Sequence, residues 1–144
     1  MLIFSKSGKL TVKDDKTNVI LPFYVPSETK KLIIHYSYSP KLVEDERLSL
    51  RYLEEGRKKY ETDFSFDEFR EVKNHITLSF DECGEYRGAC HRQPNEMTVI
   101  IAEKDSTPGV ENRKIKSGEW DIMLNVHFIG CDVNYSISVE GESE

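Results

Sequence analysis

The longest alternating stretch of the chain is WDIMLNVHF, residues 120–128. Trp120, Ile122, Leu124, Val126 and Phe128 fall at every second position, so in an extended strand they all face one side of a sheet. Polar or flexible side chains fill most of the positions between them. This period of two predicts a strand with one face in a hydrophobic core and the other toward solvent.

A second alternating stretch follows a short connection that contains Gly130. Its apolar positions also alternate, and they are Val133, Tyr135, Ile137 and Val139. Two half-buried strands joined by so short a turn are typical of a β-hairpin. We therefore predict that the chain ends in an antiparallel hairpin.

Shorter strands of the same kind precede this pair, and they are predicted at residues 1–4, 9–12, 19–21, 23–25, 31–39, 75–80 and 96–102. The small and polar residues 5–8 indicate a turn between the first two strands. Pro22 and Pro26 bracket residues 23–25, which indicates an edge strand, because proline cannot donate to a ladder.

Residues 40–72 interrupt this β pattern. Ser39 and Pro40 match an N-cap and a first helical turn, and apolar residues at roughly helical spacing continue toward Gly56. Residues 65–68 match the capping box of another short helix that ends near Val72. One or two short helices inserted around residues 40–72 are expected, with a partly ordered loop as the alternative for residues 54–63.

Eight or nine short strands with turn residues between them predict a mainly β fold, an antiparallel β-sandwich that is jelly-roll-like. The 144 residues correspond to one ordinary domain. We expect a single domain over residues 1–140 and a tail or the start of a linker at residues 141–144.

The composition bears on partners and location. With 20 basic and 26 acidic residues, the chain lacks the excess of positive charge expected of a nucleic-acid-binding protein. No apolar run is long enough to span a bilayer or to serve as a secretory signal. Cys83, Cys90 and Cys131 have unrelated spacings, so reduced thiols are expected, although Cys83 and Cys90 could form a disulfide across a hairpin. A cytoplasmic protein is predicted.

Recognisable catalytic motifs are missing from the sequence. His35, His75, His91 and His127 are isolated, without the H-x-H or H-x-x-x-H spacing that brings two imidazoles to one ion. There is also no nucleophile elbow and no glycine-rich phosphate loop. We therefore assign no catalytic residue, no metal ligand and no cofactor, and we do not expect the chain to be an enzyme.

One segment, residues 86–92, is unusual for an acidic protein. Tyr86, Arg87, His91 and Arg92 are candidates for a surface that contacts an anion or a carboxylate, because guanidinium groups suit such partners. The simpler alternative is a strand whose polar side chains point into solvent.

Several short motifs occur in a fixed order, and they are LPFYVP (21–26), IHYSYSP (34–40), LSFD (78–81), YRG (86–88), TPG (107–109), IKSGEW (115–120) and CDVNYSI (131–137). Together they resemble the N-terminal β-sandwich domain that precedes the catalytic domain in CehA/McbA-type metallohydrolases of the PHP (polymerase and histidinol phosphatase) superfamily. The resemblance implies a β-sandwich associated with a metal-dependent phosphoesterase. The histidine-x-histidine metal motif that opens the family's catalytic domain does not occur in residues 1–144, so no metal ligand is carried over.

These observations predict a non-catalytic accessory module that supports or recruits for a PHP-type phosphoesterase, with the catalytic domain or another protein as its partner. The alternatives are a protein-interaction domain, a carbohydrate-binding domain and a small metalloenzyme. A sugar platform would need Tyr36, Tyr38 and Tyr86 on one exposed face. Tyr36 and Tyr38 share the apolar face of their predicted strand, however, which favours a place in the core.

Overall fold

The computed structural model describes residues 1–43, 51–55, 72–92 and 94–143. Its strands are β1 (Leu2–Leu10), β2 (Asn18–Val25), β3 (Lys31–Ser39), β4 (His75–Glu82), β5 (Glu85–Cys90), β6 (Glu96–Ala102), β7 (Gly118–Phe128) and β8 (Val133–Glu142). A short 3-10 helix, η1 (Val12–Asp14), connects β1 to β2. Thr11 and Asp14 cap this helix through reciprocal hydrogen bonds.

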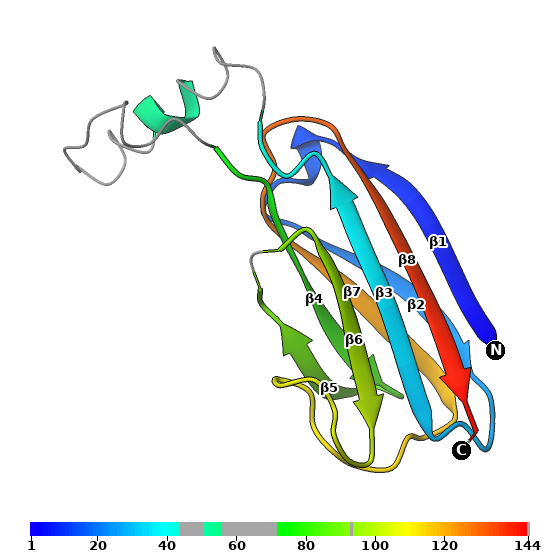
Figure 1. Ribbon diagram of the computed structural model, residues 1–144. Coiled ribbons are helices and arrows are strands. Elements are labelled where there is room, and N and C mark those ends of the chain that lie inside the picture. The colour runs from blue at the N-terminus through cyan, green and yellow to red at the C-terminus, as the bar shows by residue number, and fades with distance from the viewer. Residues whose placement is uncertain (44–50, 56–71, 93, 144) are drawn as a thin grey trace.

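The strands form two four-stranded antiparallel sheets, β1-β8-β3-β6 and β2-β7-β4-β5 (Figure 1). We call them the first and the second sheet. The first strand pairs with the eighth, the second with the seventh, the third with the sixth and the fourth with the fifth. Successive pairs lie in alternate sheets. This is the connectivity of a jelly roll. The predicted antiparallel β-sandwich is confirmed.

The core lies between the inward faces of the two sheets. Trp120, Ile122, Leu124 and Val126 of β7 are buried there, as the alternating stretch predicted. They pack in one cluster with apolar side chains of the other strands, including Leu32, Ile34, Tyr36, Tyr38, Ile76, Leu78, Phe80, Val99, Ile101, Val133, Ile137 and Val139. The expectation that Tyr36 and Tyr38 belong to the core is also confirmed.

The predicted terminal hairpin is wrong. β7 pairs with β2 and β4, whereas β8 pairs with β1 and β3, so the two strands lie in different sheets. Each strand carries a full apolar face, and the two faces meet across the core. A short connection between two amphipathic strands therefore does not distinguish a hairpin from a passage between sheets.

The predicted turn at residues 5–8 is also wrong, because β1 runs without a turn from Leu2 to Leu10. Ser5 and Ser7 pair with Ser138 and Ser136 of β8. Their small polar side chains reflect an exposed strand face at the edge of the first sheet. The predicted edge strand near Pro22 is confirmed, since β2 lies at the edge of the second sheet.

The ends of the insert between β3 and β4 are paired with each other. Leu42 forms an antiparallel bridge with Lys73, and the Val43 N–H donates to the Val72 carbonyl oxygen at 2.8 Å. Residues 40–43 therefore do not begin a helix, contrary to the expected N-cap at Ser39. Residues 51–55 are helical, whereas residues 44–50 and the predicted helix at 65–71 lie outside the described residues.

Candidate functional site

The candidate residues of segment 86–92 do not form one surface. The side chain of Tyr86 lies on the outer face of the second sheet and is 58% exposed. His91 and Arg92 follow the end of β5 and are exposed. Arg87, by contrast, is fully buried. Arg87 therefore cannot contact a ligand at the surface. Tyr86 lies near the start of β5, whereas His91 and Arg92 lie just beyond its end, so the four predicted residues do not share one surface.

A β-bulge explains why Arg87 turns inward. In the ladder between β4 and β5, Phe80 pairs with Gly88 and Asp81 pairs with Tyr86, which leaves Arg87 without an opposite residue. An extra residue of this kind breaks the alternation of side chains on its strand. Gly88 permits a close approach of the next loop, because a Cβ atom there would lie 2.5 Å from the Val110 Cα.

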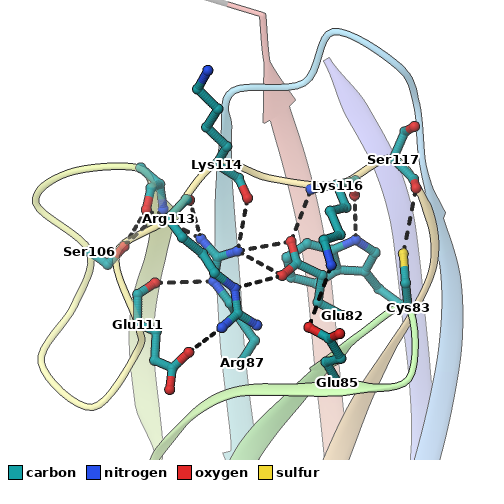
Figure 2. Close-up of polar contacts among 12 residues, drawn as sticks. Glu82, Cys83, Glu85, Arg87, Ser106, Glu111, Arg113, Lys114, Lys116 and Ser117 are labelled. Atoms are coloured by element: carbon teal, nitrogen blue, oxygen red, sulfur yellow. Dashed lines mark hydrogen bonds and ion pairs between the residues drawn. The ribbon is translucent and has the colours of Figure 1, made fainter.

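Arg87 belongs to a buried ion network with Glu82 and Arg113 (Figure 2). The Nη1 of Arg87 donates to both carboxylate oxygens of Glu82, at 2.9 and 2.8 Å. The Nε of Arg113 donates to the Oε1 of Glu82 at 3.0 Å, and the Lys116 N–H donates to Oε2 at 2.9 Å. The Arg87 guanidinium also lies 5.7 Å from the ring centre of Trp120, a cation–π distance. We call Glu82, Arg87 and Arg113 the glutamate–arginine network.

The same guanidinium fixes the long connection between β6 and β7. It donates to four backbone carbonyl oxygens at 2.6 to 3.3 Å, those of Ala102, Glu111, Arg113 and Lys114. Burial alone would raise the pKa of Glu82, but hydrogen bonds from the Lys116 N–H, Arg87 and Arg113 outweigh it and hold the pKa below its ordinary value. The network is ionised, buried and closed by internal contacts, so its role is to stabilise the fold.

A second polar cluster lies at the opposite end of β4. His75 of β4 and His127 of β7 stack with their ring centres 4.8 Å apart, and His91 meets His127 edge to face at 5.7 Å. The hydroxyl of Thr77 lies between two of these rings, 2.9 Å from the Nδ1 of His91 and 2.8 Å from the Nε2 of His127. We call these four residues the histidine cluster.

The surroundings of His75 and His127 favour the neutral form of these two imidazoles. Burial, followed by the nearby His127, Lys41 and His91, lowers the pKa of His75. Burial and His91 lower the pKa of His127. The Nδ1 of His75 is buried without a hydrogen-bond partner among the described residues. The cluster thus gathers groups that would repel one another if they were protonated.

Two features of the histidine cluster bear on catalysis and metal binding. Thr77 has a hydrogen-bonded hydroxyl next to two possible bases, but it is fully buried, so a substrate cannot reach it. Within the described parts of the chain, no three His, Cys, Asp or Glu side chains are placed to hold a metal ion. The imidazoles can take up protons and, when charged, can contact anions.

The outer face of the second sheet changes in character along the strands. One row across all four strands contains Pro22, Asp121, Asp81 and Tyr86. The next row toward the histidine cluster contains Ile20, Met123, Ser79 and Ala89. Ile20 and Tyr24 of β2 are 55% and 62% exposed. This face therefore carries exposed apolar side chains beside carboxylates.

The outer face of the first sheet is different, because short hydroxyl side chains dominate it. One row contains Ser7, Ser136, Ser37 and Glu96, and a neighbouring row contains Ser5, Ser138, His35 and Thr98. A hollow of about 700 Å³ lies over this face and is lined by residues that include Ser7, Ser37, Asn95, Asn134 and Ser136. Most of its lining residues carry hydroxyl or amide groups, and the charged Lys9 and Glu96 also line it.

Sequence reasoning missed both polar clusters. The three histidines come from positions 75, 91 and 127, and only the pairing of β4 with β5 and with β7 brings them together. No local spacing reveals such a site. A signal for the glutamate–arginine network did exist, since Glu82 lies at a position that continues the inward face of Leu78 and Phe80. A carboxylate in that position indicates a buried partner of opposite charge.

Comparisons with known proteins do not assign the chain to a family. No family model matches it, and no curated protein matches it. A crystal structure of a protein from Sulfurospirillum deleyianum aligns over 95% of this chain and 98% of its own, with 9% identity and a TM-score of 0.34. So weak a likeness supports no functional argument. In the described residues, no helix has the length and apolar character needed to span a membrane.

Proposed function

We propose that this chain is a non-catalytic interaction module that binds a partner protein through the outer face of its second sheet. The observation that carries the proposal is the set of apolar side chains exposed on that face. Ile20, Tyr24 and Tyr86 are each more than half exposed, and the cross-strand register places Met123 opposite Ile20. Tyrosine and methionine are enriched in protein interfaces, where they provide apolar area with few polar atoms to desolvate.

Charge complementarity defines the partner further. Asp81 and Asp121 are directly opposite each other in the ladder between β4 and β7. Like charges in such a pair are destabilising. Neither carboxylate has an ion-pair partner among the described residues, and the exposed Glu119 also lies on this face. A partner surface that presents lysine or arginine beside apolar side chains would relieve this repulsion.

The sequence motifs suggest one class of partner. The resemblance to the sandwich domain of CehA/McbA-type hydrolases includes LSFD (78–81) and YRG (86–88), and both segments contribute to this face. A PHP-type metal-dependent phosphoesterase is therefore the partner that we propose first. The three free thiols, Cys83, Cys90 and Cys131, support a reducing compartment, in accord with a cytoplasmic location.

Site-specific photo-crosslinking tests the docking face. A benzophenone amino acid replaces Tyr24, Tyr86 or, as the control on the other sheet, Ser136, in cells that naturally produce the protein. We expect Tyr24 and Tyr86 to capture the same protein and Ser136 not to capture it. For the purified partner, Met123→Ser and Tyr86→Ser should each weaken binding about tenfold or more, and Ser138→Ala should have no effect. Equal capture from both sheets would contradict the proposal.

An activity assay tests the non-catalytic part of the proposal separately. The purified chain is incubated with a phosphodiester and either manganese or zinc. We expect hydrolysis equal to that of the metal blank, because the described side chains provide no metal-binding group. Turnover that persists through successive purification steps would contradict the proposal without bearing on the docking face.

The hollow on the first sheet favours a second candidate function, the binding of a neutral sugar. Its hydroxyl and amide groups match the hydrogen-bonding capacity of a saccharide. The aromatic platform considered from the sequence is not formed, since Tyr36 and Tyr38 are buried. Calorimetry with a panel of glycans tests this candidate. Heat that disappears with Ser136→Val would favour it, whereas a response lost with Tyr86→Ala would place the ligand on the second sheet.

A further inference from the structure

We propose that the hollow beside His127, at the histidine end of the second sheet, binds a small tetrahedral oxyanion of the phosphate class. The hollow has a volume of about 230 Å³ and is lined by Lys16, Thr17, Asn18, Asn125, Val126 and His127. This wall combines an ammonium group, an imidazole and two side-chain amides. All of these groups can donate hydrogen bonds to an anion.

The position of Lys16 is fixed at the rim of this hollow. Its Nζ donates to the carbonyl oxygen of His127 at 3.3 Å and lies 5.6 Å from the ring centre of Phe128. The side chain is 61% exposed, and its only ion pair among the described residues is with the neighbouring Asp15, at 3.4 Å. An anion in the hollow would therefore meet an ammonium group that is already oriented toward the end of β7.

His127 provides the group that responds to pH. Its Nε2 contacts Thr77, which leaves Nδ1 without a hydrogen-bond partner within the described part of the chain. Thr77 has a single proton to donate, so at most one of His91 and His127 receives it, and the other ring must donate its own N–H. The protonated ring of His127 would donate from both nitrogens, one toward Thr77 and one available to an anion.

Positive or protonatable groups surround the cluster. From β4 comes His75, from the end of β5 come His91 and the exposed Arg92, and from the segment after β3 comes Lys41. Asp15 is the carboxylate that faces this end among the described residues. In a protein of net charge −6, a site where lysine and arginine side chains lie near protonatable imidazoles favours an anion, and the more so as the imidazoles take up protons.

Proton uptake and anion binding must be linked. An anion favours the charged imidazole, so binding raises the pKa of His127, and by reciprocity a lower pH strengthens binding. Affinity therefore rises as the pH falls through the pKa of His127 in the complex. It levels off below the pKa of His127 in the free protein, which burial and the nearby His91 hold below the ordinary value of 6.5.

Sulfate is the best first probe, because it stays divalent while the imidazoles titrate. Its affinity is measured by calorimetry at about pH 8 and about pH 5.5, the interval in which histidine changes charge, with ionic strength matched by sodium chloride. We expect binding to be roughly tenfold tighter at the lower pH. In NMR spectra, the ring signals of His127 should shift with sulfate, and those of His35 on the first sheet should not.

Two variants identify the residues. His127→Gln should abolish the pH dependence, and Lys16→Gln should weaken binding at both pH values. Because Lys16 is exposed, the second variant remains informative even if the first fails to fold. His35→Gln is the matched control and should bind as the parent does. Tighter binding of a glycerol phosphate than of inorganic phosphate would then assign a phosphate ester as the ligand, and the reverse order would assign free phosphate.

Three results would overturn the proposal. They are equal sulfate affinity at the two pH values, an affinity unchanged in both variants, and ring shifts of the same size for His35 and His127. None of these measurements involves Tyr24 or Tyr86, which lie farther along the same outer face. The anion site and the proposed interaction module can therefore fail independently.

Discussion

Strand β4 begins at His75 in the histidine cluster and ends at Glu82 in the glutamate–arginine network, and polar groups are buried differently at the two ends. At the Glu82 end, Glu82 and Arg87 are fully buried, and each is met by an opposite charge or a backbone group. At the His75 end, burial lowers the pKa of His75 and His127, and one nitrogen of His75 has no hydrogen-bond partner among the described residues. A closed network stabilises one structure, whereas an open cluster can still change its protonation state.

The largest expected effect comes from breaking the closed end. Arg87→Met removes the guanidinium and leaves the Glu82 carboxylate buried beside a single remaining cation, Arg113. Removing one partner of a buried ion pair typically lowers the free energy of unfolding by about 3–5 kcal/mol. Urea denaturation at neutral pH measures the loss.

A double variant then separates the charge from the loop anchor. Glu82→Leu combined with Arg87→Met removes the buried carboxylate together with the buried guanidinium. No buried carboxylate is then left without its Arg87 partner, so that part of the penalty disappears. The carbonyl oxygens that Arg87 served, including those of Glu111 and Arg113, still lose their donor. We expect the double variant to recover part of the loss and no more. Full recovery would show that the loop does not depend on Arg87, and no recovery would show that the ion pair is not the main contribution.

The apolar middle of the same sheet provides the next largest effect and a reference for both ends. Leu124 is fully buried and lies opposite Leu78 in the ladder between β4 and β7. Replacing Leu124 with alanine should lower the free energy of unfolding by about 2–5 kcal/mol, through lost burial and the cavity left behind. A change near zero in denaturant titrations would mean that this side chain does not face the core.

The sequence was most informative where side chains alternate. The apolar period of β7 and β8 predicted two strands with a shared core, and both strands are buried on the predicted faces. The same pattern did not show that these strands lie in different sheets. A hydrophobic pattern specifies which face of a strand is buried, but it does not specify which strand lies beside it. The jelly-roll pairing depends on contacts between residues more than 100 positions apart, such as Ser7 with Ser136.

The candidate site was harder to predict for two physical reasons. The bulge at Arg87 reverses one side chain relative to the simple alternation, so a residue expected at the surface became the centre of a buried network. The histidines then meet across three segments that no short motif connects. Tyr86 kept its predicted exposure because it lies before the bulge.

Thr77→Val breaks the open end with a smaller effect. The substitution keeps the shape of the side chain and removes the hydroxyl that two imidazoles contact. Because His91 and His127 are exposed enough for water to replace it, we expect a loss of about 1 kcal/mol in the free energy of unfolding. The matched control is Thr98→Val, which removes the hydroxyl beside His35 on the first sheet. If both variants lose the same stability, the cluster has no special contribution.

The smallest effect, the pH dependence of stability, distinguishes the two ends without a substitution. The pKa values of His75 and His127 are lowered in the folded chain, so the unfolded chain takes up protons first. Stability is therefore complete above the ordinary histidine value of 6.5, falls as the pH drops below it, and levels off once the folded imidazoles are protonated too. Glu82, whose folded pKa is also lowered, keeps its contribution until the pH falls below its ordinary value of 4.5.

Urea denaturation at closely spaced pH values should thus show two separate decreases, one below pH 6.5 from the histidines and another below pH 4.5 that includes Glu82. Replacing His75 and His127 with glutamine should remove the first decrease and leave the second. The two pH ranges correspond to the two ends of β4, because the histidines titrate at the His75 end and Glu82 titrates at the other end. A stability that rises as the pH falls through the histidine window would mean that the imidazoles are stabilised in their charged form, and the neutral, open cluster described here would be wrong.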